Sequence, residues 1–337
     1  MNYILAILGF GVLVIVHEFG HYIVAKINKV KVLEFAIGMG PRIFTYQGKE
    51  TKYSLALLPI GGQVLLLNGE EYIDDPGCML NKSHLRRISI IIAGVVMNFL
   101  LAIVLFTACN MHFGYTEKVL SGVVEDSAAS EAGFEAQDEI IKINDSRMFT
   151  YDDVSITIAQ AKDTELNVEL KRDGEVKEIN VTPRYDEESK GYLIGVKFTP
   201  VAEPGIIEST KHSFKESFTL IKQTVSSIKM LVTGRGNFKT DIGGPVTVVK
   251  LSAEVANVGI WNLLYLIAFL SISLAVFNSL PFPMLDGGTT CILLIEMITR
   301  RKVPEKVLVG INTVGFVLLM VLMAVVTIKD ILFPVSF

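Results

Sequence analysis

The sequence has little cysteine. Its three cysteines, Cys78, Cys109 and Cys291, form no CxxC pair in a chain of 337 residues, which excludes a domain held together by disulfides. Charged residues are also few, at 20%, against about a quarter in average soluble domains. No basic cluster is interleaved with aromatic residues, so we expect no nucleic-acid partner.

Apolar residues make up half of the chain, and the mean hydropathy is +0.47. They concentrate in four blocks, at about 3–25, 88–111, 260–280 and 307–328. Each block is long enough to cross about 30 Å of hydrocarbon as a helix. A signal peptide is the alternative for the first block, but Met1-Asn2-Tyr3 carries no basic residue and no small-residue cleavage site follows Ala25. We therefore expect a polytopic α-helical membrane protein with four transmembrane helices and a lipid bilayer around them.

The net charge of −4 is the sum of two opposed parts. Residues 115–200 carry 19 acidic and 10 basic side chains, a balance of −9, which leaves +5 for the rest. Basic residues gather between blocks one and two and between blocks three and four. These are Lys26, Lys29, Lys31, Arg42, Lys49, Lys52, Lys82, Arg86 and Arg87, then Arg300, Arg301, Lys302 and Lys306. Because basic loops stay in the cytoplasm, we expect both termini and the 115–200 insert to be extracytoplasmic.

Residues 31–67 alternate in short apolar stretches at 32–37, 42–46, 52–58 and 63–67, separated by Gly and Pro. This pattern predicts a membrane-associated β hairpin or small sheet. The pattern of the 115–200 insert predicts strands at 119–124, 139–144, 166–171 and 176–181, with a hairpin turn at Asp173-Gly174 and a helix at 152–161.

Apolar side chains recur at steps of four and three from Phe214 to Val232, which predicts an amphipathic helix. It would lie on the membrane surface or serve as an ordinary domain helix; the sequence leaves both open. We accordingly divide the chain into an N-terminal membrane part (1–114), the insert (115–200), a helix and linker (201–258) and a C-terminal membrane part (259–337).

The first apolar block contains His17-Glu18-Phe19-Gly20-His21. Residues i and i+4 share one face of a helix, so both imidazoles can bind one metal ion, and Glu18 can take a proton from water. Ionisable side chains inside an apolar span are costly and rarely idle. An interfacial His/Glu cluster is the alternative. We expect a zinc site with His17 and His21 as ligands and Glu18 as the catalytic residue.

A catalytic zinc ion takes three protein ligands and keeps an open position. His84, His112 and His212 are poorly placed, in a loop or outside the apolar blocks. Asp286 is the single carboxylate between Glu254 and Glu296, and by the orientation above it lies at the depth of His21. An Asp before Gly-Gly is most often a turn former, but the missing ligand and the matched depth favour Asp286 as the third ligand.

These motifs resemble those of the bacterial site-2 proteases, intramembrane zinc metalloproteases of regulated intramembrane proteolysis. HEFGH at 17–21 is similar to the family's HExxH, and NSLPFPMLDGG at 278–288 to its N-x-x-P-x-P-x-L-D-G motif, whose Asp is the third zinc ligand. Further likenesses lie at 38–41, 59–62, 93–98 and 243–246, so the resemblance covers nearly the whole chain. It implies that Asn278 contacts the substrate backbone.

The insert resembles a PDZ domain of the bacterial protease type, on residues 127–134 and 138–144. Ala128 replaces the pattern's Pro, Gln137 replaces its Gly, and Asp145 stands where a Gly often follows Asn144. The stretch that we expect to bind a peptide is Leu120, Ser121, Gly122 and Val123. The resemblance implies that the domain filters substrates by size.

The leading hypothesis is an intramembrane zinc metalloendopeptidase that cleaves single-span membrane proteins, such as anti-sigma factors or remnant signal peptides, in the bacterial cytoplasmic membrane. An edge strand within 52–67, including Gly61 and Gly62, would hold the unwound segment, and an upstream site-1 protease is a possible partner. The alternatives are an inactive adaptor that binds peptides through its PDZ domain, against which Glu18 argues, and a metal transporter, which predicts more ligands on other spans.

Overall fold

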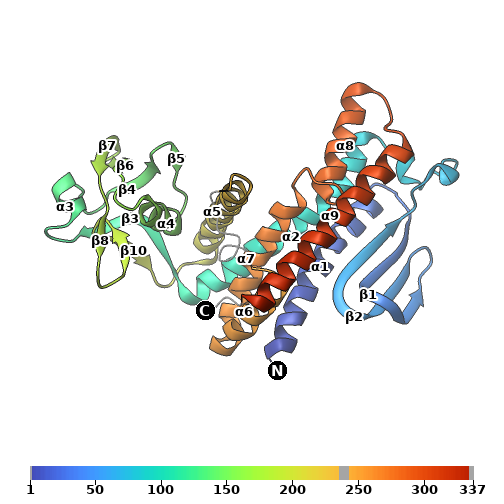
Figure 1. The fold of residues 1–337 in the computed structure, drawn as a ribbon, viewed down its shortest axis with the longest axis horizontal. Helices are drawn as coiled ribbons and strands as arrows, with labels where there is room; N and C mark the ends of the chain where they lie inside the picture. The colour runs from blue at the N-terminus through green and yellow to red at the C-terminus, as the bar shows by residue number, and fades with distance from the viewer. Residues whose placement is uncertain (1, 235–242, 334–337) are drawn as a thin grey trace. The chain divides into compact units, whose positions relative to one another are not determined.

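A computed structural model describes residues 2–234 and 243–333 (Figure 1). Four of its helices are long and apolar enough to cross a membrane, by length and composition. They are α1 (Asn2–Ile27), α2 (His84–Phe113), α7 (Ile260–Asn278) and α9 (Glu305–Leu332). Three contain a whole expected block, and α7 ends two residues before the end of the expected block 260–280. The prediction of a multi-pass helical membrane protein is therefore confirmed at this level.

The chain divides into two compact units, 1–105 with 224–337, and 106–223. In the first unit, α1 packs against α6 (Pro245–Val258), α7 and the strand β2, and α6 also contacts α7 and α9. Pro245 stands in the first turn of α6, where its missing N–H costs nothing. Asp330 of α9 accepts hydrogen bonds from the backbone N–H groups of Gly244 and Thr247, at 3.1 and 2.9 Å, and so caps α6. The sequence reading missed both α6 and α8 (Asp286–Thr299).

Strands β1 (Val32–Gln47) and β2 (Lys52–Leu66) form a separate sheet. Residues 34–37 are paired twice, with 62–65 on one side and with 52–55 on the other, while 42–47 pair with 52–56. The two long strands therefore build four short paired segments, close to the four expected stretches. The segments with an outer edge left are 62–66 and 42–47.

The second unit holds the strand order β10-β3-β4-β6-β7, with β5 paired to β4. Its strands are β3 (Tyr115–Val123), β4 (Glu139–Ile143), β5 (Ser146–Arg147), β6 (Leu166–Arg172), β7 (Glu175–Val181) and β10 (Val196–Val201), beside a small pair, β8 (Arg184–Asp186) and β9 (Gly191–Leu193). Helices α3 (Ala128–Ala132) and α4 (Tyr151–Ala161) complete it. Alternate residues of β6, at 166, 168 and 170, point into one core with Leu120, Phe134 and Val154. In β4 the core residues are Ile140 and Ile143, on either side of a register shift.

Local chemistry explains the turns of this unit. Ser127 caps α3 by accepting the N–H of Ser130, and Gly133 ends the helix with φ +89°. Asp173 and Gly174 both have positive φ between β6 and β7, as a two-residue hairpin turn requires. Gln137 has φ +72°, so it occupies a left-handed position that favours the glycine of the PDZ pattern.

Helix α5 (Ile206–Val232) buries a polar face. Ser209, Ser213 and Ser217 recur every four residues and are fully buried, whereas Phe214 and Phe218 on the expected apolar face are 41% and 49% exposed. The amphipathic pattern is thus present, but the apolar stripe is not the side that packs inside the second unit.

Candidate metal centre

Three side chains from two helices converge on one point. His17 and His21, one turn apart on α1, bring their Nε2 atoms to 3.2 Å from each other. Asp286 Oδ2 lies 3.1 Å from His17 Nε2 and 3.6 Å from His21 Nε2. Within the described ranges this is the one group of three or more His, Cys, Asp or Glu side chains with ligand atoms this close together.

Asp286 reaches this point because the chain after α7 folds back tightly. It is the first residue of α8, eight positions beyond Asn278, which ends α7. A Cβ on Gly287 would lie 2.3 Å from the carbonyl oxygen of Ser279, and one on Gly288 would lie 2.1 Å from that of Phe282. Both positions therefore require glycine. The Asp-Gly-Gly sequence is a turn former and also the device that carries the carboxylate to the histidines.

The donor set fits a zinc ion. Atoms bound tetrahedrally at about 2.0–2.1 Å from zinc are roughly 3.3 Å apart, close to the three separations observed. Asp286 Oδ2 is buried and has no hydrogen-bond partner among the described residues, as expected of an atom that needs a cation.

Gly94 of α2 leaves the space for these groups. A Cβ there would lie 2.6 Å from His17 Cε1 and from His21 Nε2, and 2.7 Å from His17 Nε2. Gly20 of α1 allows the same close crossing, because its own Cβ would lie 2.4 Å from the carbonyl oxygen of Ala93. Helices α1 and α2 thus meet backbone to backbone beside the cluster.

Glu18 lies between the cluster and the sheet. Its carboxylate accepts a hydrogen bond from the backbone N–H of Val64 and interacts electrostatically with His17, His21 and Asp286. A Cβ on Gly62 would lie 2.9 Å from Glu18 Cγ, so glycine is needed where β2 passes this side chain. Gly61 precedes it with φ +89°. The outer edge of residues 62–66 therefore reaches the only carboxylate of α1.

Comparison with known proteins agrees with this arrangement. A family model described as peptidase family M50 matches residues 5–322. The chain belongs to peptidase family M50, the site-2 protease family. It is 44% identical to a proposed zinc metalloprotease of Clostridium acetobutylicum, over all of this chain and 99% of that protein. It is also 30% identical to the zinc metalloprotease RasP of Bacillus licheniformis, over 98% and 99% of the two chains, and 29% identical to the regulator of sigma-W protease RasP of Bacillus subtilis, over 96% of each.

Membership of the M50 family makes the protein a metalloprotease with zinc as its cofactor. The same comparison confirms the resemblance stated from the motifs at 17–21 and 278–288. The protein's four apolar helices agree with a membrane-bound member of this family.

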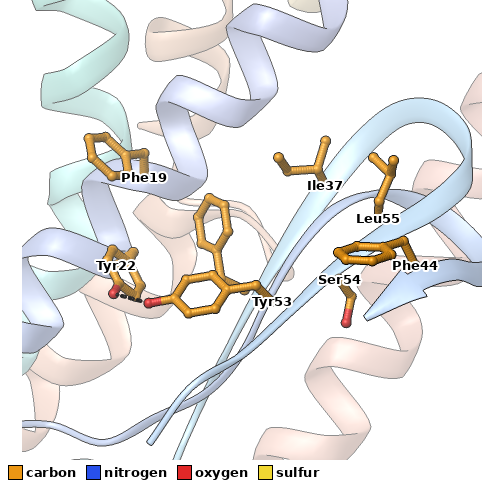
Figure 2. A pocket seen from close by; sticks show the side chains of 8 residues that line it. Phe19, Tyr22, Ile37, Phe44, Tyr53, Ser54 and Leu55 are labelled. Carbon is orange, nitrogen blue, oxygen red and sulfur yellow. Dashed lines mark hydrogen bonds between the residues drawn. The ribbon is translucent and has the colours of Figure 1, made fainter. Parts of the chain in front are cut away.

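A pocket of about 350 Å³ lies between α1 and the sheet of this M50 protease (Figure 2). Its lining is almost wholly apolar and comes from Phe19, Tyr22, Phe35, Ile37, Phe44, Tyr53, Ser54 and Leu55. At one end the hydroxyls of Tyr22 and Tyr53 share a hydrogen bond of 2.8 Å, and nearby Lys26 bonds Glu50 at 2.9 Å. Sequence patterns did not indicate this pocket, because its two walls come from different elements, α1 and the sheet, whose lining residues are 13 or more positions apart in the chain.

The residues that we expected to bind substrate lie in two separate places, Asn278 at the end of α7 and residues 120–123 in β3. Asn278 ends α7, eight residues before Asp286. Residues 120–123 of β3 pair with β10 along one side, whereas the pairing of β3 with β4 is confined to Val119. Leu120 is fully buried in the core. The role of Leu120, Ser121, Gly122 and Val123 in binding a peptide stays a prediction.

Proposed function

We propose that the protein is an intramembrane zinc metalloendopeptidase that cleaves the transmembrane segments of single-span membrane proteins. The observation that carries this proposal is the position of Glu18, between the His17–His21–Asp286 cluster and the outer edge of residues 62–66. A proton-transferring group, three metal ligands and a surface for an extended chain meet there.

The strand edge addresses the main obstacle to cutting a helix. Every backbone N–H and C=O inside a transmembrane helix is bonded within that helix, so the scissile carbonyl must first be freed. Pairing with residues 62–66 would replace the lost helical hydrogen bonds with strand hydrogen bonds. Gly61 and Gly62 would let the added segment approach closely, since neither carries a side chain. The resemblance to the family adds Asn278 as a further contact to the substrate backbone.

His17, His21 and Asp286 would hold zinc and leave its remaining position open. When bound, zinc supplies Lewis-acid polarisation of the scissile carbonyl and lowers the pKa of water toward about 7. Glu18 then accepts the proton of the attacking water and delivers it to the departing amine. The backbone N–H of Val64 orients the Glu18 carboxylate for both transfers.

The orientation proposed from the basic residues is supported by contacts at one end of the helices. Arg87, at the start of α2, lies 3.4 Å from Glu296 near the end of α8, and Glu296 also accepts the N–H of Val303. Asn28, just after α1, bonds Ser89 at 3.4 Å. The two basic loops therefore lie at the same end of this unit, which we place at the cytoplasmic face of the bacterial plasma membrane, with both termini extracytoplasmic.

We further propose that residues 115–200 are an extracytoplasmic PDZ domain that admits substrates already shortened by a site-1 protease. Ser127 caps α3, Gly133 ends that helix and Asp138 is buried, and all three stand at positions of the PDZ pattern. Asp138 bonds Arg172 through both carboxylate oxygens, at 2.6 and 2.7 Å. Anti-sigma factors and remnant signal peptides are the substrate types that we expect.

The proposal is tested by measuring how fast the Glu18→Gln variant cleaves a single-span substrate in liposomes, compared with the wild-type protein. This variant should bind zinc normally and cleave about 10²- to 10⁴-fold more slowly, because it keeps the ligands and loses the proton acceptor. Glu175→Gln, which changes an exposed carboxylate on β7, is the matched control and should cleave at the wild-type rate. Wild-type cleavage by Glu18→Gln, or cuts mapped by mass spectrometry outside the span, would refute the proposal.

The ligand set has its own test. Asp286→Ala should lower the zinc content of the purified protein, because two protein ligands hold zinc more weakly than three. An unchanged zinc stoichiometry would remove Asp286 from the set while leaving the role of Glu18 open to the first test.

A further inference from the structure

The two histidines of the cluster differ in what holds their second ring nitrogen. His21 Nδ1 lies 2.8 Å from the backbone carbonyl oxygen of Ile90. A carbonyl only accepts, so Nδ1 must carry the proton and donate it. Nε2 of His21 is then unprotonated and turned toward Asp286, as a metal ligand must be.

His17 has an ambiguous partner instead. Its Nδ1 lies 3.3 Å from the side-chain amide of Asn98 on α2, which is completely buried. An amide presents a donor or an acceptor according to which end faces the ring. If Nδ2 faces the ring and donates, His17 carries its proton on Nε2, the atom that points at Asp286, and this atom has no lone pair left for a metal.

The opposite orientation makes His17 equivalent to His21. With Oδ1 facing the ring, Nδ1–H donates to Asn98 and the Nε2 lone pair is free. In the observed orientation, Oδ1 is buried and has no hydrogen-bond partner among the described residues. That orientation therefore leaves an acceptor unsatisfied, and it also places the His17 proton on the atom that a metal ion would need.

We propose that Asn98 is a positioning residue for zinc, accepting the Nδ1–H of His17 through its side-chain oxygen. This rests on the proposed function in one respect, that His17 is a ligand. The backbone carbonyl oxygen of Asn98 accepts a hydrogen bond of 2.8 Å from Ser271 of α7, which is itself fully buried. Three helices, α1, α2 and α7, thereby meet at one ligand.

Two substitutions separate an acceptor from a mere space-filler. Asn98→Leu keeps the volume and removes the acceptor, so zinc should bind about 10- to 100-fold more weakly, the usual effect of losing the partner of a ligating histidine. Asn98→Asp keeps an acceptor and removes the donor, so zinc should bind within a few-fold of wild type. Zinc affinity is measured on the full-length protein in detergent, by competition with a chelator, after thermal unfolding of each metal-free variant confirms that it is folded.

Two controls make the outcome unambiguous. Ser271→Ala removes a hydrogen bond to the same residue without touching its amide, and should leave zinc affinity within a few-fold of wild type. His17→Ala should lose affinity strongly, and a normal affinity there would overturn the ligand set and with it the proposed function. If His17→Ala loses affinity while Asn98→Asp is as weak as Asn98→Leu, or Asn98→Leu binds like wild type, the role of Asn98 alone is refuted. If Asn98→Leu does not fold, Asn98→Asp still tests the role: weak zinc binding by this folded variant, which keeps an acceptor for Nδ1–H, would refute it.

Discussion

Gly94→Ala is the most direct test of where the metal centre lies. The added methyl group would sit 2.6 Å from His17 Cε1 and from His21 Nε2, against about 3.5 Å or more for ordinary carbon contacts. The rings would have to shift by close to 1 Å, whereas zinc sites tolerate about 0.2 Å in ligand distance. The atoms in the way belong to side chains, and alanine favours a helix more than glycine does. We therefore expect α2 to form normally and the ligands to be displaced.

The expected result is a zinc dissociation constant raised at least 100-fold, a loss of about 2.7 kcal/mol, with thermal unfolding of the metal-free protein little changed. Affinity is measured by chelator competition and content by mass spectrometry. Gly310→Ala is the matched control: it is the same change inside an apolar helix, and apart from the adjoining helix backbone no described atom lies within 4 Å of the new Cβ. Normal zinc affinity in Gly94→Ala would show that His17 and His21 do not bind the ion in the observed geometry.

Two further predictions concern the second unit. Burial, with a smaller effect of Lys215, lowers the pKa of His212 to about 4, from about 6.5 in an unfolded chain. Its neutral form is the stabilising one, so stability should be full above pH 6.5 and fall as pH drops toward 4. His212→Phe, which keeps the stacking on Tyr115, should flatten that decline in a pH series of thermal unfolding, and an unchanged pH profile would contradict this. Gln137→Gly should raise stability by about 0.5–1 kcal/mol, because glycine relieves a left-handed backbone; a lower melting temperature would contradict it.

The four apolar helices could be predicted because each is a continuous apolar stretch long enough to cross a membrane. Span 260–280 is apolar on every side, and α7 has the expected start and nearly the expected end. The HEFGH motif also predicts the positions of its own histidines, because residues four apart lie on one face of a helix and this brings His17 and His21 together. Predicting Asp286 as the third ligand also required an argument from its depth in the membrane. Its approach to the histidines depends on the fold-back of the chain that the following glycines allow, and this fold-back has no sequence period.

What the sequence did not indicate depends on contacts between distant segments. Asn98 lies 81 positions from His17, and although the family likeness at 93–98 includes it, that likeness does not indicate which side chain it contacts. The double pairing of residues 34–37 has no local pattern either, because each strand alone reads as an ordinary hairpin arm. The inner position of β3 follows from β10, a strand about 75 residues later that the sequence reading missed.

The backbone contact of α1 with α2 has a consequence for motion. Gly20, Ala93 and Gly94 leave these helices no layer of side chains on which to slide, and small residues at such crossings favour close, rigid packing in membranes. The sheet is held in two ways: Val32, Val64 and Leu66 pack into a core with Ala25 and Ile90, whereas hydroxyl and ion-pair contacts at Tyr22 and Lys26 join it to α1 near the apolar pocket. Exposed polar contacts break and re-form at little cost. We therefore expect opening for a substrate to occur at the pocket end of the sheet, and the part of the centre that holds the histidines to stay fixed.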